Sequence, residues 1–262
     1  MTRLAVVGGG RMGEALLGGL LGAEWAEPGE LAVVEPVAAR REELAARYPG
    51  VSLSDEPVPA DGVVVAVKPD QVEPVCAALG GLEVGRLLSI AAGVTLARIE
   101  AAAPGLPVVR AMPNTPALVG AGAAAIAGGS LASADDLDWA EGILGAVGIV
   151  VRVKEPLLDA VTGLSGSGPA YVFLVVESLI EAGVLAGLPR ETSRELAVAT
   201  VLGSARLLAE TGDDPAALRA AVTSPAGTTA AGLRELEDRA TRAAFLAAVA
   251  AATERSRQLA ES

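Results

Sequence analysis

Short runs of consecutive apolar residues alternate with segments of helical periodicity through the first part of the chain. The apolar runs predict strands at residues 4–7, 31–35, 62–67, 87–91, 108–112, 122–127 and 149–153. The intervening segments predict helices at residues 12–21, 37–48, 70–79, 96–103 and 135–147. Strands that are apolar along their whole length and alternate with crossover helices are typical of a parallel sheet covered on both faces. We therefore predict an α/β fold whose N-terminal part is a doubly wound, Rossmann-like, mostly parallel sheet.

The pattern changes after about Lys154, where Ala, Leu and Glu dominate and the apolar runs stop. Turn-forming residues interrupt this part at Gly187–Pro189, Gly212–Pro215 and Ser224–Gly227. They predict five or six helices in an all-helical second domain. We expect one domain at residues 1–154 and a second at residues 155–262.

Residues 170–188 form an apolar run almost long enough to cross a bilayer. The run contains Glu177 and Glu181, whose charges are costly in lipid. We interpret it as a helix buried by packing within protein, and we expect no membrane association.

Composition narrows the function classes. Of the 262 residues, 52% are apolar and 20% are charged, which is typical of a globular protein. The formal net charge of -12 disfavours nucleic acid as a partner. A single cysteine, Cys76, and a start without a leader segment lead us to expect a reducing, cytoplasmic location. The chain has no histidine, so its chemistry must proceed without an imidazole.

A glycine-rich turn joins the first predicted strand to the first predicted helix. Gly8, Gly10 and Gly13 fit the pattern G-x-G-x-x-G, with Gly9 and the pair Arg11–Met12 between them. In a dinucleotide site these glycines allow a tight turn, a close approach of the backbone to pyrophosphate, and close helix packing. The alternative is a turn of the same shape that binds nothing.

Glu35 ends the second predicted strand, where dinucleotide sites carry a carboxylate that accepts hydrogen bonds from the ribose. This position favours NAD. Arg40 and Arg41 follow closely and offer a 2′-phosphate a counter-charge, so NADP stays open. In the alternative interpretation, Glu35 is a solvated charge.

Two further strand ends bring small and polar residues to the same predicted rim. Lys68, one of two lysines, follows Ala66–Val67 and precedes Pro69, and Ser89–Gly93 follows the next strand. Ligands in open α/β sheets lie outside the carboxyl ends of the strands. Lys68 is therefore a candidate binding residue, with an ordinary surface lysine as the alternative.

A series of motifs in this order resembles pyrroline-5-carboxylate reductases over residues 4 to about 240. The motifs are the glycine turn, AVKP at residues 66–69, SIAAGVT at 89–95, MPNTP at 112–116, LSGSGPAYVF at 164–173 and VTSPAGTT at 222–229. The resemblance implies NADPH- or NADH-dependent reduction of 1-pyrroline-5-carboxylate to L-proline, the last step of proline biosynthesis. It also implies a helical C-terminal domain that forms a homodimer or larger homo-oligomer and supplies a substrate loop.

The resemblance assigns residues to both ligands. It implies nucleotide contacts from Gly8, Gly9, Gly10, Arg11, Met12, Gly13, Glu35, Ala66, Val67, Lys68, Pro69, Ala91, Ala92 and Gly93. It implies that Ser224, Gly227 and Thr228 receive the substrate carboxylate and that the catalytic residue Thr229 hydrogen-bonds the ring nitrogen; no metal is implied.

The residues of the substrate loop agree with this assignment on their own. Backbone N–H groups and hydroxyls just before a helix expected to start near Ala230 can bind a carboxylate. The alternative is a plain turn with Thr228 or Thr229 as the helix cap. Arg11 stands where many family members have Asn, and Ala226 where a second Gly is common. We expect Ala226 to avoid a positive φ.

A cyclic imine can be reduced without a strong acid, because it can bind already protonated and accept a hydride to give a neutral amine. Catalysis is then mainly positioning and electrostatic stabilisation. One alternative is a hydroxyacid dehydrogenase of the same architecture, but residues 168–187 lack the lysine such enzymes carry. The other is a protein that binds NAD(P) without turnover.

Overall fold

The computed structural model describes residues 2–261, which form two compact units. Unit 1 comprises the chain up to Ser167 and again from Ala250 onward, and unit 2 comprises Gly168–Val249. The chain thus leaves unit 1, forms unit 2, and returns. The two domains predicted from the sequence, residues 1–154 and 155–262, remain a prediction.

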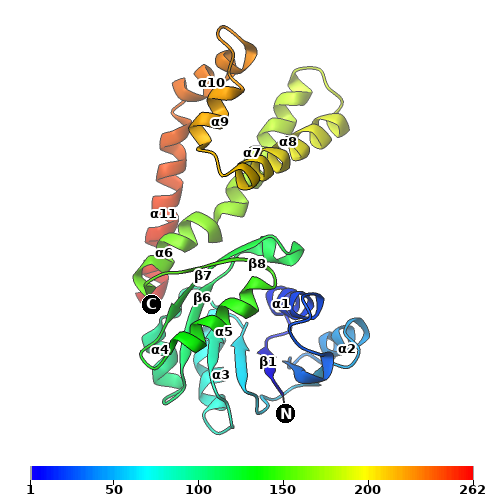
Figure 1. The fold of residues 1–262 in the computed structure, drawn as a ribbon, viewed down its shortest axis with the longest axis vertical. Coiled ribbons are helices and arrows are strands. Elements are labelled where there is room, and N and C mark those ends of the chain that lie inside the picture. The colour runs from blue at the N-terminus through cyan, green and yellow to red at the C-terminus, as the bar shows by residue number, and fades with distance from the viewer. Residues whose placement is uncertain (1, 262) are drawn as a thin grey trace. The chain divides into compact units, whose positions relative to one another are not determined.

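Unit 1 is built on an eight-stranded sheet with the order β3-β2-β1-β4-β5-β6-β7-β8 (Figure 1). All neighbouring strands are parallel except β6 and β7. The predicted mostly parallel, doubly wound sheet is confirmed, with an additional short edge strand, β3, that the apolar pattern did not indicate. The strands are β1 (Leu4–Val7), β2 (Leu31–Val34), β3 (Ser52–Ser54), β4 (Gly62–Val65), β5 (Leu87–Ser89), β6 (Val108–Met112), β7 (Gly122–Gly128) and β8 (Gly148–Arg152).

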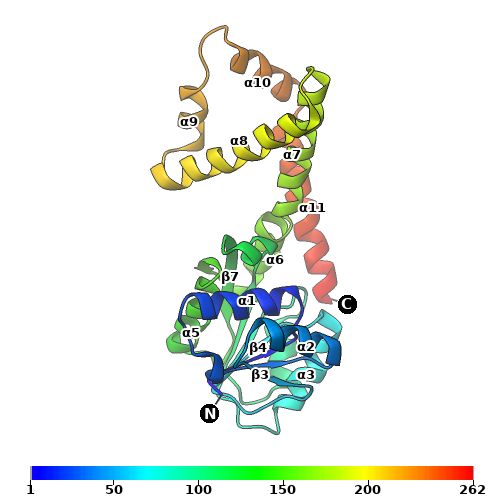
Figure 2. The same ribbon diagram turned by 90° about the vertical axis from the view of Figure 1, so that its right-hand side faces the viewer.

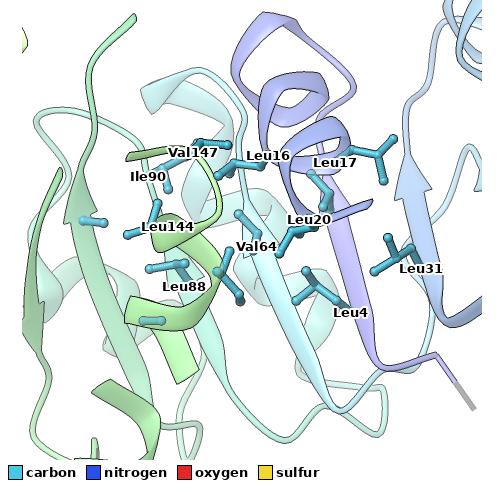
Figure 3. Packing of buried hydrophobic residues seen from close by; sticks show 14 of the residues in the cluster. Leu4, Leu16, Leu17, Leu20, Leu31, Val64, Leu88, Ile90, Leu144 and Val147 are labelled. Carbon is cyan, nitrogen blue, oxygen red and sulfur yellow. The ribbon is translucent and has the colours of Figure 1, made fainter. Parts of the chain in front are cut away.

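Helices cover both faces of the sheet, because each parallel strand sends alternate side chains to opposite faces. Leu4 and Val6 pack with residues of α1, α2 and α5, whereas Ala5 and Val7 pack with residues of α3, α4 and α6. Figure 3 shows the first cluster, in which leucines of α1 lie over β1 and β4. The helices of this unit are α1 (Arg11–Gly22), α2 (Ala38–Arg47), α3 (Val72–Leu79), α4 (Leu96–Ala102), α5 (Ala134–Gly145) and α6 (Leu158–Val161).

Shorter helical turns connect these elements. A π-helical turn, η5, follows α6 directly and ends before the first residue of α7. The 3₁₀ turns are η1 (Pro28–Glu30), η2 (Pro69–Gln71), η3 (Thr115–Val119) and η4 (Glu155–Leu157), and the π-helical turn is η5 (Thr162–Gly166).

Unit 2 is entirely helical in its described residues. The three predicted breaks lie between α7 and α8, α8 and α9, and α9 and α10, and they are confirmed. A fourth break, between α10 and α11, was not predicted and contains Ala240 at φ 55°. The helices are α7 (Gly168–Leu185), α8 (Arg190–Thr211), α9 (Pro215–Ala221), α10 (Thr228–Asp238) and α11 (Thr241–Glu261), whose later part belongs to unit 1.

Helix α7 exposes apolar side chains that the sequence analysis expected to be buried. In the single chain, Phe173 is 65% exposed, Leu174 63% and Leu185 91%. The helical stretch Glu155–Leu185 is long and apolar enough to cross a membrane, but one such helix is weak evidence for a span. Large exposed apolar side chains on one helix are typical of a surface that contacts a partner.

The last turns of α11 pack against unit 1 (Figure 2). Thr253 and Ser256 are buried, and the Ser256 hydroxyl donates a hydrogen bond to Asp159 Oδ1 at 2.7 Å. Leu259 lies beside Gly93, since a Cβ added to that glycine would be 3.6 Å from the Leu259 Cβ. The end of the chain therefore supports the loop that follows β5.

Candidate functional site

Four loops meet at the carboxyl edge of the sheet in unit 1. They follow Val34, Val7, Val65 and Ser89, which are in register across the neighbouring strands β2, β1, β4 and β5. These loops, with the first turns of the helices that follow two of them, contain all the residues predicted to bind a nucleotide: Gly8–Gly13, Glu35, Ala66–Pro69 and Ala91–Gly93. The register of the strands therefore gathers these separate sequence motifs at one edge.

The glycines of the first loop are required for different reasons. A Cβ on Gly8, whose φ is +107°, would lie 2.6 Å from the Ala66 carbonyl oxygen, and one on Gly13 would lie 2.0 Å from the Gly8 oxygen. Both glycines are therefore dictated by packing within the protein. Gly10 differs, because it has an ordinary extended backbone at φ -69° and no atom within 4 Å of an added Cβ. Its missing side chain leaves open space directly before α1.

Gly9, between them, is held by the segment after β2. Its N–H donates to Glu35 Oε2 at 3.0 Å, and its carbonyl oxygen accepts from Arg40 Nε at 2.8 Å. The other Glu35 oxygen accepts the Val37 N–H at 3.0 Å. Glu35 thus lies beside the glycine loop, as a ribose-binding carboxylate must.

Glu14 on α1 extends this arrangement and was not singled out by the sequence. Its carboxylate accepts hydrogen bonds from Arg40 and from Arg47, and its side chain is 16% exposed. Partial desolvation alone would raise the pKa of Glu14, but the hydrogen bonds and charges of the two arginines outweigh it and hold the pKa below its ordinary value. Only the three-dimensional packing of α1 against α2 reveals this network.

The remaining predicted nucleotide residues differ in exposure. Arg11 and Met12 open α1, whose N-cap, Gly10, has no side-chain cap. Ala66 and Val67 lie beside Gly8, and the adjacent Lys68 and Pro69 are exposed. In the last loop Ala91 is buried, Ala92 is exposed, and Gly93 has φ +76°.

The predicted substrate loop lies in unit 2, between α9 and α10. The Gly227 N–H donates to the Ser224 carbonyl at 3.0 Å, which closes a tight turn. Helix α10 starts at Thr228 with Gly227 as its N-cap and without a side-chain cap. The exposed Thr228 and Thr229 therefore do not serve as the cap, and the first N–H groups of α10 are free of side-chain acceptors.

Ala226 corrects one expectation. We expected this position to avoid a positive φ, but its φ is 58°, in the left-handed region. The reason is the tight turn that brings Gly227 back to Ser224, where a Cβ on Gly227 would lie 2.3 Å from the Ser224 hydroxyl oxygen. An alanine in this region is strained by roughly 1–2 kcal/mol relative to glycine.

Two polar residues that were not among the predicted site residues, Asn114 and Arg110, join neighbouring elements of unit 1. Asn114, after β6, donates to the Ser165 carbonyl at 3.0 Å and accepts the Ala123 N–H at 2.9 Å, which links the sheet to η5. Arg110 is buried on β6 and pairs with Glu155 at 2.8 Å. The MPNTP motif signals Asn114, but no local pattern joins Arg110 to Glu155.

The site fits a dinucleotide on structural grounds. Gly10 keeps space open at the uncapped N-terminus of a twelve-residue helix, where N–H groups and the helix dipole favour a pyrophosphate. Glu35 lies at the position of a ribose acceptor. Among the described residues, no cluster of three or more metal-ligating side chains occurs.

Comparison with known proteins agrees with both halves of the chain. Residues 155–259 match the family described as pyrroline-5-carboxylate reductase dimerisation, and residues 3–93 match the family described as NADP oxidoreductase, coenzyme F420-dependent. Two curated relatives are pyrroline-5-carboxylate reductases. The one from Synechocystis sp. is 47% identical over 98% of both chains, and the one from Corynebacterium melassecola is 44% identical over 99% of both.

Solved structures give the same result. The pyrroline-5-carboxylate reductase of Coxiella burnetii superposes with a TM-score of 0.93 at 35% identity, covering 100% of this chain and 99% of that one. The Plasmodium falciparum pyrroline carboxylate reductase with NADP bound superposes with a TM-score of 0.85 at 31% identity, covering 99% and 98%. With its motifs, its fold and its full-length relatives in agreement, the chain belongs to the pyrroline-5-carboxylate reductase family.

Proposed function

We propose that this chain reduces 1-pyrroline-5-carboxylate to L-proline with a nicotinamide dinucleotide, the final step of proline biosynthesis. The observation that carries the proposal is the glycine loop, in which Gly10 alone has no structural reason within the protein to be glycine. A ligand that needs that space supplies the reason. Family membership over the whole chain then selects the reaction among those that use such a loop.

The preference between the two cofactors follows from Glu35. A carboxylate next to the Gly9 N–H accepts ribose hydroxyls but repels a 2′-phosphate. We therefore expect the chain to favour NADH over NADPH, although a solved relative holds NADP. The ratio of the two values of kcat/KM measures this preference directly.

The substrate binds through its carboxylate and its ring nitrogen in this proposal. Ser224, Gly227 and Thr228 are assigned to the carboxylate. The Ser224 hydroxyl and the Thr228 N–H are the donors, because the uncapped start of α10 attracts an anion, whereas the Gly227 N–H already closes the turn. The Thr229 hydroxyl is assigned to the ring nitrogen. When bound, the reduced nicotinamide supplies the hydride.

Thr229 orients the substrate rather than protonating it. A ring imine that binds already protonated becomes a neutral amine on accepting a hydride, so the threonine hydroxyl has no proton to deliver in that step. The chain's lack of histidine is compatible with this chemistry. Positioning by Thr229 and electrostatic stabilisation by the loop are the contributions expected from the protein.

The test is nicotinamide oxidation with 1-pyrroline-5-carboxylate, with L-proline identified as the product. Thr229→Val should lower kcat/KM about tenfold, the effect of one hydrogen bond of roughly 1.4 kcal/mol. Thr223→Val is the matched control, because the Thr223 hydroxyl donates to the Arg219 carbonyl in the last turn of α9 at 2.6 Å. Oxidation of neither cofactor by folded, nucleotide-binding protein would refute the reductase and favour a nucleotide sensor.

The chain acts as a homo-oligomer in this proposal, because the exposed apolar side chains of α7 fall within the matched dimerisation region. The number of subunits is settled by light scattering. With a net charge of -12 and one buried cysteine, we further propose a cytoplasmic enzyme without nucleic-acid or membrane partners.

A further inference from the structure

Gly9 is fixed on both sides by side chains that follow β2. Glu35 accepts its N–H at 3.0 Å, and Arg40 donates to its carbonyl oxygen at 2.8 Å. The Leu44 side chain packs over the same residue, since a Cβ on Gly9 would lie 2.8 Å from Leu44 Cδ1. Gly9 is therefore the anchored residue of the loop, directly before the open position Gly10.

Arg40 uses all three nitrogens of its guanidinium in this arrangement. Nε donates to Gly9, Nη1 donates to Glu43 at 2.8 Å, and Nη2 donates to Glu14. The Arg40 side chain is only 26% exposed. A planar group held by three acceptors from α1, α2 and the loop has little freedom to turn toward a ligand.

The neighbouring charges are also paired. Arg41 donates to the carbonyl oxygens of Glu35 at 2.7 Å and Pro36 at 2.9 Å, and it lies 3.6 Å from Asp55. Arg47 bonds the remaining oxygen of Glu14. A 2′-phosphate at this edge would meet arginines that are already neutralised by carboxylates, together with the Glu35 carboxylate itself.

We propose that Arg40 is a positioning residue of the nucleotide site, which holds the glycine loop through the Gly9 carbonyl and does not bind the 2′-phosphate of NADPH. This inference rests on the proposed nicotinamide site and deepens it. Arg40 contributes equally to the binding of both cofactors, because both place their pyrophosphate against the same loop. The choice between them falls to Glu35.

The test is direct binding of NADH and NADPH, titrated separately by calorimetry, which requires no turnover. Arg40→Gln should raise both dissociation constants by a similar factor, roughly fivefold to tenfold, because the charge-assisted hydrogen bond to Gly9 is lost. The ratio of the two dissociation constants should stay at the parent value. Arg40→Lys keeps the positive charge but lacks the three guanidinium nitrogens that donate to Gly9, Glu43 and Glu14. Its affinity for both cofactors should therefore also be lower than the parent's.

Arg47→Gln is the matched control. It removes a cation from the same Glu14 carboxylate but has no contact with Gly9, so both affinities should remain at the parent level. Thermal unfolding of each variant without nucleotide separates loss of fold from loss of affinity. A loss of fold alone would leave the dissociation constants of the folded fraction unchanged, which would overturn the proposal.

The other outcomes are equally distinct. If Arg40→Gln weakens NADPH alone and Arg40→Lys restores it, Arg40 is a phosphate ligand and the proposal is wrong. If the parent binds a nucleotide and the Arg40→Gln variant binds NADH and NADPH with the parent's affinities, the hydrogen bond to Gly9 is not needed for binding and the proposal is again wrong. If the folded parent binds neither nucleotide, the nicotinamide function itself fails.

Discussion

Alanine at Gly10 should separate ligand binding from folding, because this glycine leaves space that no protein atom uses. Its φ of -69° and ψ of -174° are ordinary for alanine, and no atom lies within 4 Å of the added methyl group. Alanine is a poorer N-cap by up to about 1 kcal/mol, but it restricts the unfolded chain by about 0.4–1 kcal/mol. The free energy of unfolding should therefore change by less than about 1 kcal/mol.

Nucleotide affinity should fall far more than stability. In the proposed nucleotide site, the methyl group would lie where a pyrophosphate approaches the backbone and would force it away from the N–H groups of the helix start. Losing one or two charge-assisted hydrogen bonds, each worth about 1.5–3 kcal/mol, corresponds to a loss of tenfold to hundredfold or more in affinity.

Two glycines of the same helix provide the comparison. Gly13→Ala places a Cβ 2.0 Å from the Gly8 carbonyl oxygen, and this backbone clash should cost about 3 kcal/mol or more in stability. Gly22→Ala meets no atom within 4 Å and lies far from the loop, so it should leave affinity unchanged. Calorimetric titration with NADH and urea unfolding measure the two quantities. If Gly10→Ala binds NADH like the parent, the open space is not the nucleotide site.

Three further predictions concern the rest of unit 1. Glu155→Gln leaves Arg110 buried without a counter-charge and should cost about 2–3 kcal/mol in urea unfolding, less than a fully buried pair because the Glu155 side chain is 29% exposed; a loss under about 0.5 kcal/mol would contradict this. The pKa of Glu14 is lowered, so its stabilising effect is complete above the ordinary carboxyl pKa and is lost as pH falls below that value and through the lowered pKa; the stability difference between parent and Glu14→Gln should shrink in acid, and a constant difference would count against the pairing. Burial, with a smaller contribution from the charge of Glu73, raises the pKa of the Cys76 thiol to about 11, so at pH 8 about one thousandth is thiolate and alkylation should require unfolding; rapid labelling of native protein would disagree.

The central strands were predictable because a strand buried on both faces reads as an unbroken apolar run, as in Leu4–Val7 and Leu31–Val34. An apolar run does not indicate whether a strand is parallel or antiparallel to its neighbour, so the antiparallel pairing of β7 with β6 was not predicted. Strand β3, Ser52–Ser54, is short and half-polar at the sheet edge, and therefore gives no apolar run.

The candidate site was predictable where a backbone requirement fixes a residue type. The clashes at Gly8 and Gly13 explain why the loop shows its glycine spacing in the sequence. The hydrogen bond from Arg40 to Gly9 joins residues 31 positions apart, and any arginine on α2 would give the same local pattern. The conformation of Ala226 was predicted wrongly for the opposite reason. A glycine at this position would have indicated a left-handed turn, whereas an alanine gives no such signal.

Because the last turns of α11 belong to unit 1, unit 1 cannot finish folding until unit 2 has been synthesised. Unit 2 is an insertion within unit 1, and the last turns of the chain, which cover the loop containing Gly93, are made last. At about 5–20 residues per second, the segment Gly168–Val249 delays those turns by roughly 4–16 s after Ser167 is made. The nascent sheet therefore spends this interval with the loop that follows β5 uncovered, until the residues from Ala250 onward are made.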